Sequence, residues 1–252
     1  SIHIKKILSE EIKKKVKPEI VRTTFAKPFL IESDKASRFI SPGSDLWSTD
    51  IGKSIINSSV YNSGKIYSVF KDGSVICLDN SGVEQWRFET NERILSPPVI
   101  EDDLLVLASD DGDIITLNSN TGNPHQIIGT GERISSGISV IDITGNETNK
   151  AVSVGTVYGN VYCYDLLTLD PLWTQQLAFG SSEISIVSSI VHSDNKIFFF
   201  DNKGTLYCYS AANGMLIWKL EASNNGWKSR EQVSNSQVIV DNNLYLIDTA
   251  GN

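Results

Sequence analysis

Short apolar runs, each bounded by Gly, Asn, Asp or Ser, recur along most of the chain. β-branched and aromatic residues dominate these runs, as in "KIYSVF" (65–70), "SVICLD" (74–79) and "VEQWRF" (83–88). Such segments are typical of β-strands, and they lack the 3.6-residue spacing of an amphipathic helix. The pattern therefore predicts an all-β fold for residues 29–252.

The runs come in sets of four, and a glycine marks the same point of each set. This glycine follows the second run in a turn such as Lys71-Asp72-Gly73, whose residues tolerate positive φ. The hairpin glycines are 39, 47, 45 and 47 residues apart: Gly73, Gly112, Gly159, Gly204 and Gly251. Four short antiparallel strands per period of this length predict the blades of a β-propeller. The repeats span about 52–90, 91–130, 131–178 and 179–228, with a partial repeat at 229–252.

A tryptophan is the second landmark of the repeat. It lies four residues after a turn glycine in the pairs Gly43–Trp47, Gly82–Trp86 and Gly214–Trp218. The other two repeats depart from this rule, because Leu169 takes the glycine place before Trp173 and Gln126 takes the tryptophan place after Gly122. The tryptophan positions are 39, 40, 47 and 45 residues apart, so both landmarks keep one period.

The stretch from the third run to the tryptophan carries a motif. It reads "CLDNSGVEQW" at 77–86, "TLNSNTGNPHQ" at 116–126, "CYDLLTLDPLW" at 163–173 and "CYSAANGMLIW" at 208–218. This order resembles the PQQ-like (quinoprotein-type) β-propeller repeat family over residues 41–252. The resemblance implies that Trp47, Trp86, Trp173 and Trp218 dock each blade onto its neighbour. Trp227, in the loop "SNNGWKSR", lies outside the motif and is a candidate for a partner-binding surface.

Cys77, Cys163 and Cys208 share one register, four residues after a hairpin glycine. Equivalent positions of a propeller are spread around a ring and do not gather at one point. Cysteine also packs as a small apolar residue. The register therefore favours small buried residues between blades over a redox or metal site.

The two ends of the chain leave the number of blades open. After residue 228 only "SQVIV" and "NLYLI" follow, and "SDLWSTD" at 44–50 resembles a fourth strand without its first three. Joining both ends would build a fifth blade, if part of 28–40 supplied its third strand. The alternative is a piece of a longer propeller, since the family commonly has seven or eight blades, and the abrupt end favours it.

Residues 1–28 form a separate basic segment. They hold eight Lys or Arg and three Asp or Glu, whereas the remainder holds 14 and 27. Ile4, Leu8, Ile12 and Val16 are spaced four apart, which predicts an amphipathic helix over 1–17 that Pro18 ends. Such a helix suits packing on the propeller, a partner or a membrane surface. The acidic remainder argues against nucleic acid as a partner, and no signal peptide pattern is visible.

Two functions remain. A quinoprotein dehydrogenase of this repeat type uses an adjacent cysteine pair, a stacking tryptophan and Ca²⁺, but the chain has no Cys-Cys pair and no C-x-x-C-H haem site. His3, His125 and His192 are scattered, and the acidic run 110–113 is a repeat turn. No catalytic, cofactor or metal residue is therefore assigned; PQQ and Ca²⁺ belong only to the enzyme alternative.

The second function is a non-catalytic binding scaffold. Non-catalytic relatives of this repeat type include the lipoprotein of the bacterial outer-membrane assembly machinery and extracytoplasmic sensor domains. The long loops 142–150 and 223–231 are the candidate contact sites, because insertions in a repeat map to loops. The resemblance implies an extracytoplasmic protein with a protein partner.

Overall fold

The computed structural model describes residues 2–6, 19–23, 49–55, 59–90, 92–94, 96–143, 149–177, 184–221, 238–240 and 243–246. Every regular element in these ranges is a β-strand, which confirms the predicted all-β class. A helix long and apolar enough to cross a membrane is not found in this part of the chain. Trp47, Trp227 and Gly251 lie outside the described residues, as do most of the loops 142–150 and 223–231.

Four sheets each contain four consecutive antiparallel strands, as the repeat predicts. The first blade consists of β3 (Val60–Asn62), β4 (Lys65–Val69), β5 (Ser74–Asp79) and β6 (Glu84–Glu89). The second consists of β7 (Val99–Glu101), β8 (Leu104–Ala108), β9 (Asp113–Asn118) and β10 (Pro124–Gly129). The third consists of β11 (Ser139–Asp142), β12 (Lys150–Gly155), β13 (Asn160–Asp165) and β14 (Pro171–Gln176). The fourth consists of β15 (Val191–Ser193), β16 (Lys196–Phe200), β17 (Leu206–Ser210) and β18 (Leu216–Leu220).

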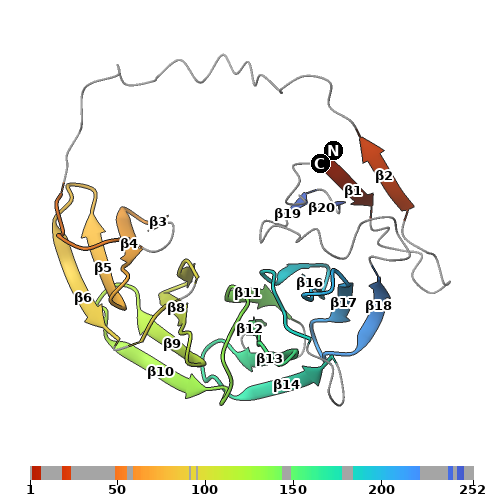
Figure 1. Cartoon of the computed structure of the whole chain (residues 1–252). Coiled ribbons are helices and arrows are strands. Elements are labelled where there is room, and N and C mark those ends of the chain that lie inside the picture. The colour runs from red at the N-terminus through yellow and green to blue at the C-terminus, as the bar shows by residue number, and fades with distance from the viewer. Residues whose placement is uncertain are drawn as a thin grey trace.

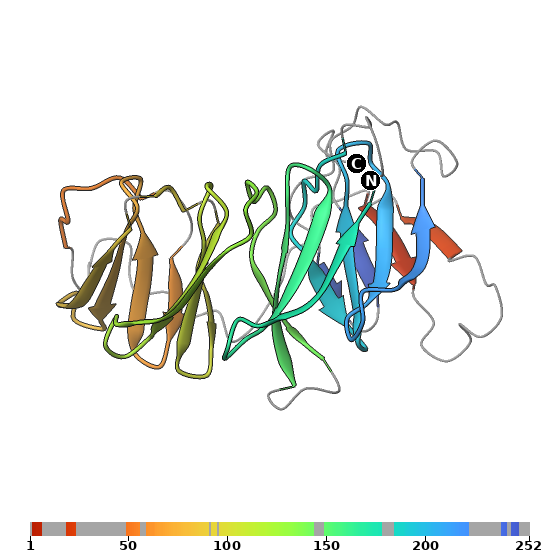
Figure 2. The same cartoon turned by 90° about the horizontal axis from the view of Figure 1, so that it is seen from below.

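The blades follow one another along an arc. Their first strands contact each other in chain order, β3 with β7, β7 with β11 and β11 with β15. The fourth strands β6, β10, β14 and β18 form the outer rim (Figure 1). Seen from below, the sheets stand side by side in a row (Figure 2). This is the radial arrangement of propeller blades.

The core lies between successive sheets. Between the first and second blades, Val75 and Cys77 pack with Leu105 and Leu107, all fully buried. Each central strand is covered on both faces, so β8 and β16 are nearly continuous apolar runs without polar alternation. Burying one such side chain contributes roughly 1.5–3 kcal/mol, and the stack of sheets therefore has a large apolar core.

A fifth sheet combines both ends of the chain, in the order β19 (Val238–Val240), β20 (Asn243–Leu246), β1 (Ile2–Lys6) and β2 (Glu19–Thr23). Its third strand is β1, where we expected part of 28–40, and its fourth strand is β2, where we expected residues 44–50. β19 contacts β15, and Leu244 packs against Phe198 and Phe200 of the fourth blade.

The helix predicted over residues 1–17 is wrong for residues 2–6, which form β1. Ile4 pairs with Val21 on one side and with Tyr245 on the other, so the strand is bonded along both edges. Ile2 and Ile4 are two residues apart, a spacing that fits a strand as well as the four-residue spacing fits a helix. Residues 7–18 lie outside the described residues.

Candidate interaction surface

Two motif tryptophans bind the next blade by a hydrogen bond. The Trp86 Nε1 group donates to the Ser119 carbonyl oxygen at 3.0 Å, and the Trp173 Nε1 group donates to the Ala211 carbonyl oxygen at 2.8 Å. Both acceptors lie directly after the third strand of the following blade. The hydrogen bond satisfies the indole N–H while the ring covers apolar surface. Trp218 packs against Phe198, with ring centroids 6.0 Å apart.

The turn glycine of the following blade makes room for each indole. A Cβ on Gly122 would lie 2.6 Å from ring atoms of Trp86, and one on Gly214 would lie 2.5 Å from Cε3 of Trp173. Both glycines also have positive φ. The sequence motif therefore couples a tryptophan in one blade to a glycine in the next.

The contact between the second and third blades is built differently. At the tryptophan position stands Gln126, and the neighbouring His125 is bonded through Nε2 to the Leu167 carbonyl oxygen at 3.1 Å. At the glycine position stands Leu169, which is buried and keeps a φ of +56°. The two departures from the motif thus occur at the two sides of one junction.

The hairpin glycines have two structural reasons. Gly73, Gly112, Gly159 and Gly204 all have φ between +76° and +110°. In addition, a Cβ on Gly73 or Gly112 would collide with the carbonyl oxygen of Glu92 or Glu132 in the segment that enters the next blade. The residues of the turn predict the positive φ. They do not predict the close contact with Glu92 or Glu132, because that contact depends on the segment that enters the next blade.

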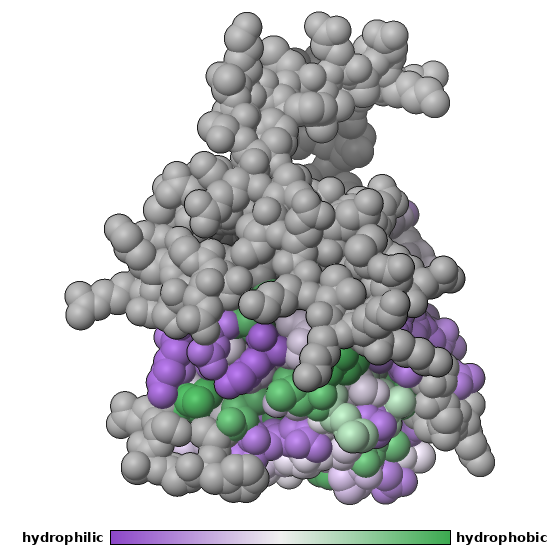
Figure 3. Space-filling model, turned by 90° about the vertical axis from the view of Figure 1, so that its right-hand side faces the viewer, coloured by the Kyte–Doolittle hydropathy of each residue, from purple (hydrophilic) through white to green (hydrophobic). Residues whose placement is uncertain are grey.

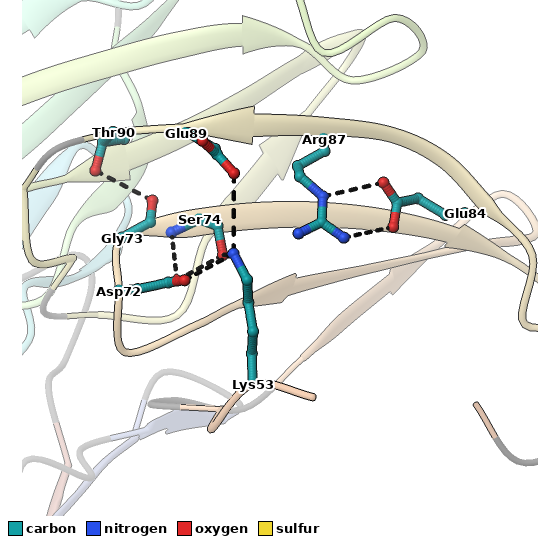
Figure 4. A network of polar contacts seen from close by, with 8 residues as sticks. All are labelled: Lys53, Asp72, Gly73, Ser74, Glu84, Arg87, Glu89 and Thr90. Atoms are coloured by element: carbon teal, nitrogen blue, oxygen red, sulfur yellow. Dashed lines mark hydrogen bonds and ion pairs between the residues drawn. The ribbon is translucent and has the colours of Figure 1, made fainter. Parts of the chain in front are cut away.

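A network of charged side chains lies on the first blade, at the turn between β4 and β5 and on the outer strand β6 (Figure 4). Lys53 Nζ lies 2.7 Å from Asp72 Oδ2 and donates to Ser74 Oγ at 3.0 Å. The contact with Lys53, together with the Ser74 hydroxyl that donates to Asp72 Oδ1 at 2.6 Å, holds the pKa of Asp72 well below its usual range. On β6, Arg87 is paired with Glu84 at 2.8 Å. Charged side chains on an edge strand oppose pairing with another strand.

The three cysteines are buried, free thiols in three different blades. Burial raises the pKa of Cys163 and of Cys208 to about 12, and it also raises the pKa of Cys77. A buried thiol with a raised pKa is a poor nucleophile, because the thiolate is the reactive form. These positions therefore serve packing between the blades.

A polar cluster lies where the inner strands of the second to fourth blades meet. Lys150 Nζ is 2.5 Å from Glu101 Oε1 and 3.4 Å from Asp142 Oδ1. Burial lowers the pKa of the nearby His192, which favours its neutral form.

In the acidic turn of the second blade, Asp110 is paired with Arg133 at 2.7 Å. Among the described residues, no group of three or more His, Cys, Asp or Glu side chains could hold a metal ion.

The outer edge of the fourth blade is apolar. The side chain of Met215, directly before β18, is 64% exposed, and those of Leu216 and Ile217 at the start of β18 are 50% and 36% exposed. Leu172, 37% exposed, precedes Trp173, whose indole rests against Gly214. Figure 3 shows apolar surface, bordered by polar side chains, on the side of the molecule that carries β18. We name Met215, Leu216 and Ile217 the apolar edge; the sequence signal for it is three successive apolar residues before Trp218.

Comparison with known proteins identifies the family. A family model described as "Outer membrane protein assembly factor BamB" matches residues 37–252. The chain belongs to this family. Its resemblance to the PQQ-like repeat is thereby confirmed.

Two relatives that match the chain are distant from it in sequence. The outer membrane protein assembly factor BamB of Burkholderia pseudomallei is 23% identical over 210 residues, which are 79% of this chain and 52% of that protein. The crystal structure of BamB from Moraxella catarrhalis superposes with a TM-score of 0.57 at 17% identity, covering 80% of this chain and 73% of that one.

An enzyme shares the fold. A quinohemoprotein alcohol dehydrogenase from Pseudomonas putida HK5 gives a TM-score of 0.58 at 13% identity, over 81% of this chain and 41% of the enzyme. At such identity the likeness shows the propeller architecture alone. The chain spans about half the length of the curated relatives that it matches.

Proposed function

We propose that the chain is a non-catalytic β-propeller that binds other proteins outside the cytoplasm, as part of outer membrane protein assembly. The exposed apolar edge on β18 is the observation that carries the proposal, because exposed, contiguous apolar side chains are a mark of protein-binding surfaces. Membership in the family of an outer membrane protein assembly factor supports the setting.

Among the described residues, the three thiols and two of the turn carboxylates have structural contacts. The buried thiols pack between blades, and Asp72 and Asp110 form ion pairs within the repeat. The proposal therefore assigns no PQQ and no Ca²⁺ to the chain. The rival function is a quinoprotein dehydrogenase, or a PQQ-binding piece of one.

Calorimetric titration with pyrroloquinoline quinone, with and without Ca²⁺, separates the two functions. We expect no saturable heat. Binding at 1:1 with micromolar affinity or better would overturn the scaffold function in favour of the enzyme.

Association is tested in the organism that encodes the chain. The tagged full-length gene product should copurify with other proteins of the outer membrane assembly machinery, and deletion of the gene should lower the amount of folded outer membrane proteins. Normal levels together with no copurifying assembly protein would contradict the proposal.

A further inference from the structure

We propose that the apolar edge on β18 binds an extended, uncharged and apolar segment of a partner protein as an added β-strand. This inference deepens the proposed function and rests on it. It names the surface of the propeller that binds and the chemistry of the segment that it takes.

The backbone of β18 is open to pairing. β18 is the last strand of its sheet, and none of the described strands pairs with its outer side. Such an edge offers unpaired N–H and C=O groups, for which another extended chain is the matching partner.

The other three rims are protected at the same positions. Each outer strand has one extra residue directly before the tryptophan position: Gln85, His125, Leu172 and Ile217. One residue earlier stand Glu84, Pro124 and Pro171 in the first three blades, against Leu216 in the fourth. A charge or a proline at an edge blocks strand addition, since proline lacks the N–H donor. Leu216 leaves that donor in place.

The charges around the edge decide the chemistry of the partner. Lys219, the charged residue of β18, is paired with Glu221 at 2.9 Å. The pair leaves the apolar edge without net charge, whereas Glu84, Arg87 and Glu89 leave β6 with a net charge of −1. An apolar, neutral segment complements this surface. The apolar edge directly follows Gly214, which packs against Trp173. This contact holds the edge in place before a partner binds.

The probe is a capped peptide of about ten residues that alternates valine and threonine, the length and pattern of a strand. A fluorescent label reports its binding to the full chain by anisotropy. The test variant combines Met215→Asp, Leu216→Pro and Ile217→Gln, which copies Asp170, Pro171 and Gln85 of the other blades. The matched control is Ile127→Gln, which removes a 55% exposed isoleucine from β10.

We expect the triple variant to lose at least about tenfold in affinity, equivalent to ~1.4 kcal/mol, while the control binds as the parent does. A peptide N-methylated on alternate amides should lose binding too, because it keeps the side chains but lacks strand hydrogen bonds. Strand addition would be refuted if the parent and the triple variant bound the peptide with equal affinity. It would also be refuted if the parent bound the unmodified and the N-methylated peptide with equal affinity. Absence of binding to the parent at about 1 mM would also refute it.

Two further outcomes separate the alternatives. A concentration-dependent dimer of the parent, abolished in the triple variant, would refute the inference and show a second copy of this chain as the occupant. Copurification with the assembly machinery without peptide binding would refute only the edge as the binding site. Peptide binding without that copurification would refute the proposed function and leave the edge site standing. The single variant Leu216→Pro provides the same comparison if the triple variant fails to fold.

Discussion

Gly214 lies directly against the indole of Trp173, so close that a Cβ at this position would stand 2.5 Å from the ring atom Cε3. The same relationship joins Gly122 to Trp86 two blade interfaces earlier. Between them, the second and third blades carry Gln126 and Leu169 at the corresponding places. Gln126 is smaller than the tryptophan of the other blades, and Leu169 in the next blade is larger than their glycine. The two departures from the motif therefore fall on opposite sides of the same junction.

The first prediction concerns the room that Gly122 leaves for Trp86. We expect Gly122→Ala to lower the free energy of unfolding by about 2–4 kcal/mol, since the new methyl group overlaps the indole and the backbone is strained. Gly131→Ala is the matched control, because Gly131 has a similar φ of +75° and nothing within 4 Å of a Cβ. It should cost only about 1 kcal/mol.

Urea unfolding followed by tryptophan fluorescence measures both variants. If the two substitutions cost the same, the strain of positive φ explains the whole effect. The contact with Trp86 would then not be the reason for glycine at this position.

The second prediction exchanges the exceptional junction for the common one. Gln126→Trp alone should destabilise the protein, because Leu169 is buried where the glycine of other junctions admits an indole. Adding Leu169→Gly should recover part of the loss and relieve the positive φ of a leucine. A double-mutant cycle should give a favourable coupling of about 1 kcal/mol or more. Additive effects would show that the two positions do not form a pair.

The repeat could be predicted from the sequence because its markers are local. The turn glycine after Asp72 and the four-residue spacing from Gly82 to Trp86 involve only residues that are close in the sequence, so they can be recognised without knowing the fold. The fold class, with four-stranded antiparallel blades, followed from these markers. The partner of each tryptophan could not be read in this way, since it lies in another blade.

The error at the N-terminus has a physical cause. Ile4 belongs to a four-residue series with Leu8 and to a two-residue series with Ile2, so periodicity fits a helix and a strand. The decision comes from β20, more than 200 residues away, which bonds to one edge of β1. The apolar edge is visible in the sequence only when the motifs are aligned, because Leu216 then stands where the other blades have Glu84, Pro124 and Pro171.

The third prediction concerns the thiols. Cys163 and Cys208 should not react with a water-soluble disulfide reagent in the folded protein, because burial blocks access and raises the pKa of each thiol to about 12. All three cysteines should react rapidly in denaturant. Rapid labelling of one or more thiols under native conditions, counted by intact mass, would contradict the packing role.

The fourth prediction concerns the ion pair of Asp72 and Lys53. The pKa of Asp72 is lowered in the folded protein, chiefly by hydrogen bonds from Lys53 and Ser74. A carboxyl group with a depressed pKa stabilises the fold fully above its unfolded pKa, near 4, and loses this contribution as the pH falls through the folded value. Asp72→Asn should therefore be less stable than the parent at neutral pH, and the difference should shrink in acid. Because the side chain of Asp72 is 50% exposed, we expect only about 0.5 kcal/mol after solvent screening.

Unfolding curves of the parent and the variant between about pH 2 and pH 7 measure this difference. Asp111→Asn is the matched control, since it removes the same charge at the same turn position of the second blade. It should leave the pH dependence of stability closer to that of the parent. A difference between Asp72→Asn and the parent that stays constant down to the lowest pH would show that the variant disturbs the turn itself. The ion pair of Asp72 with Lys53 would then contribute nothing to the free energy of unfolding.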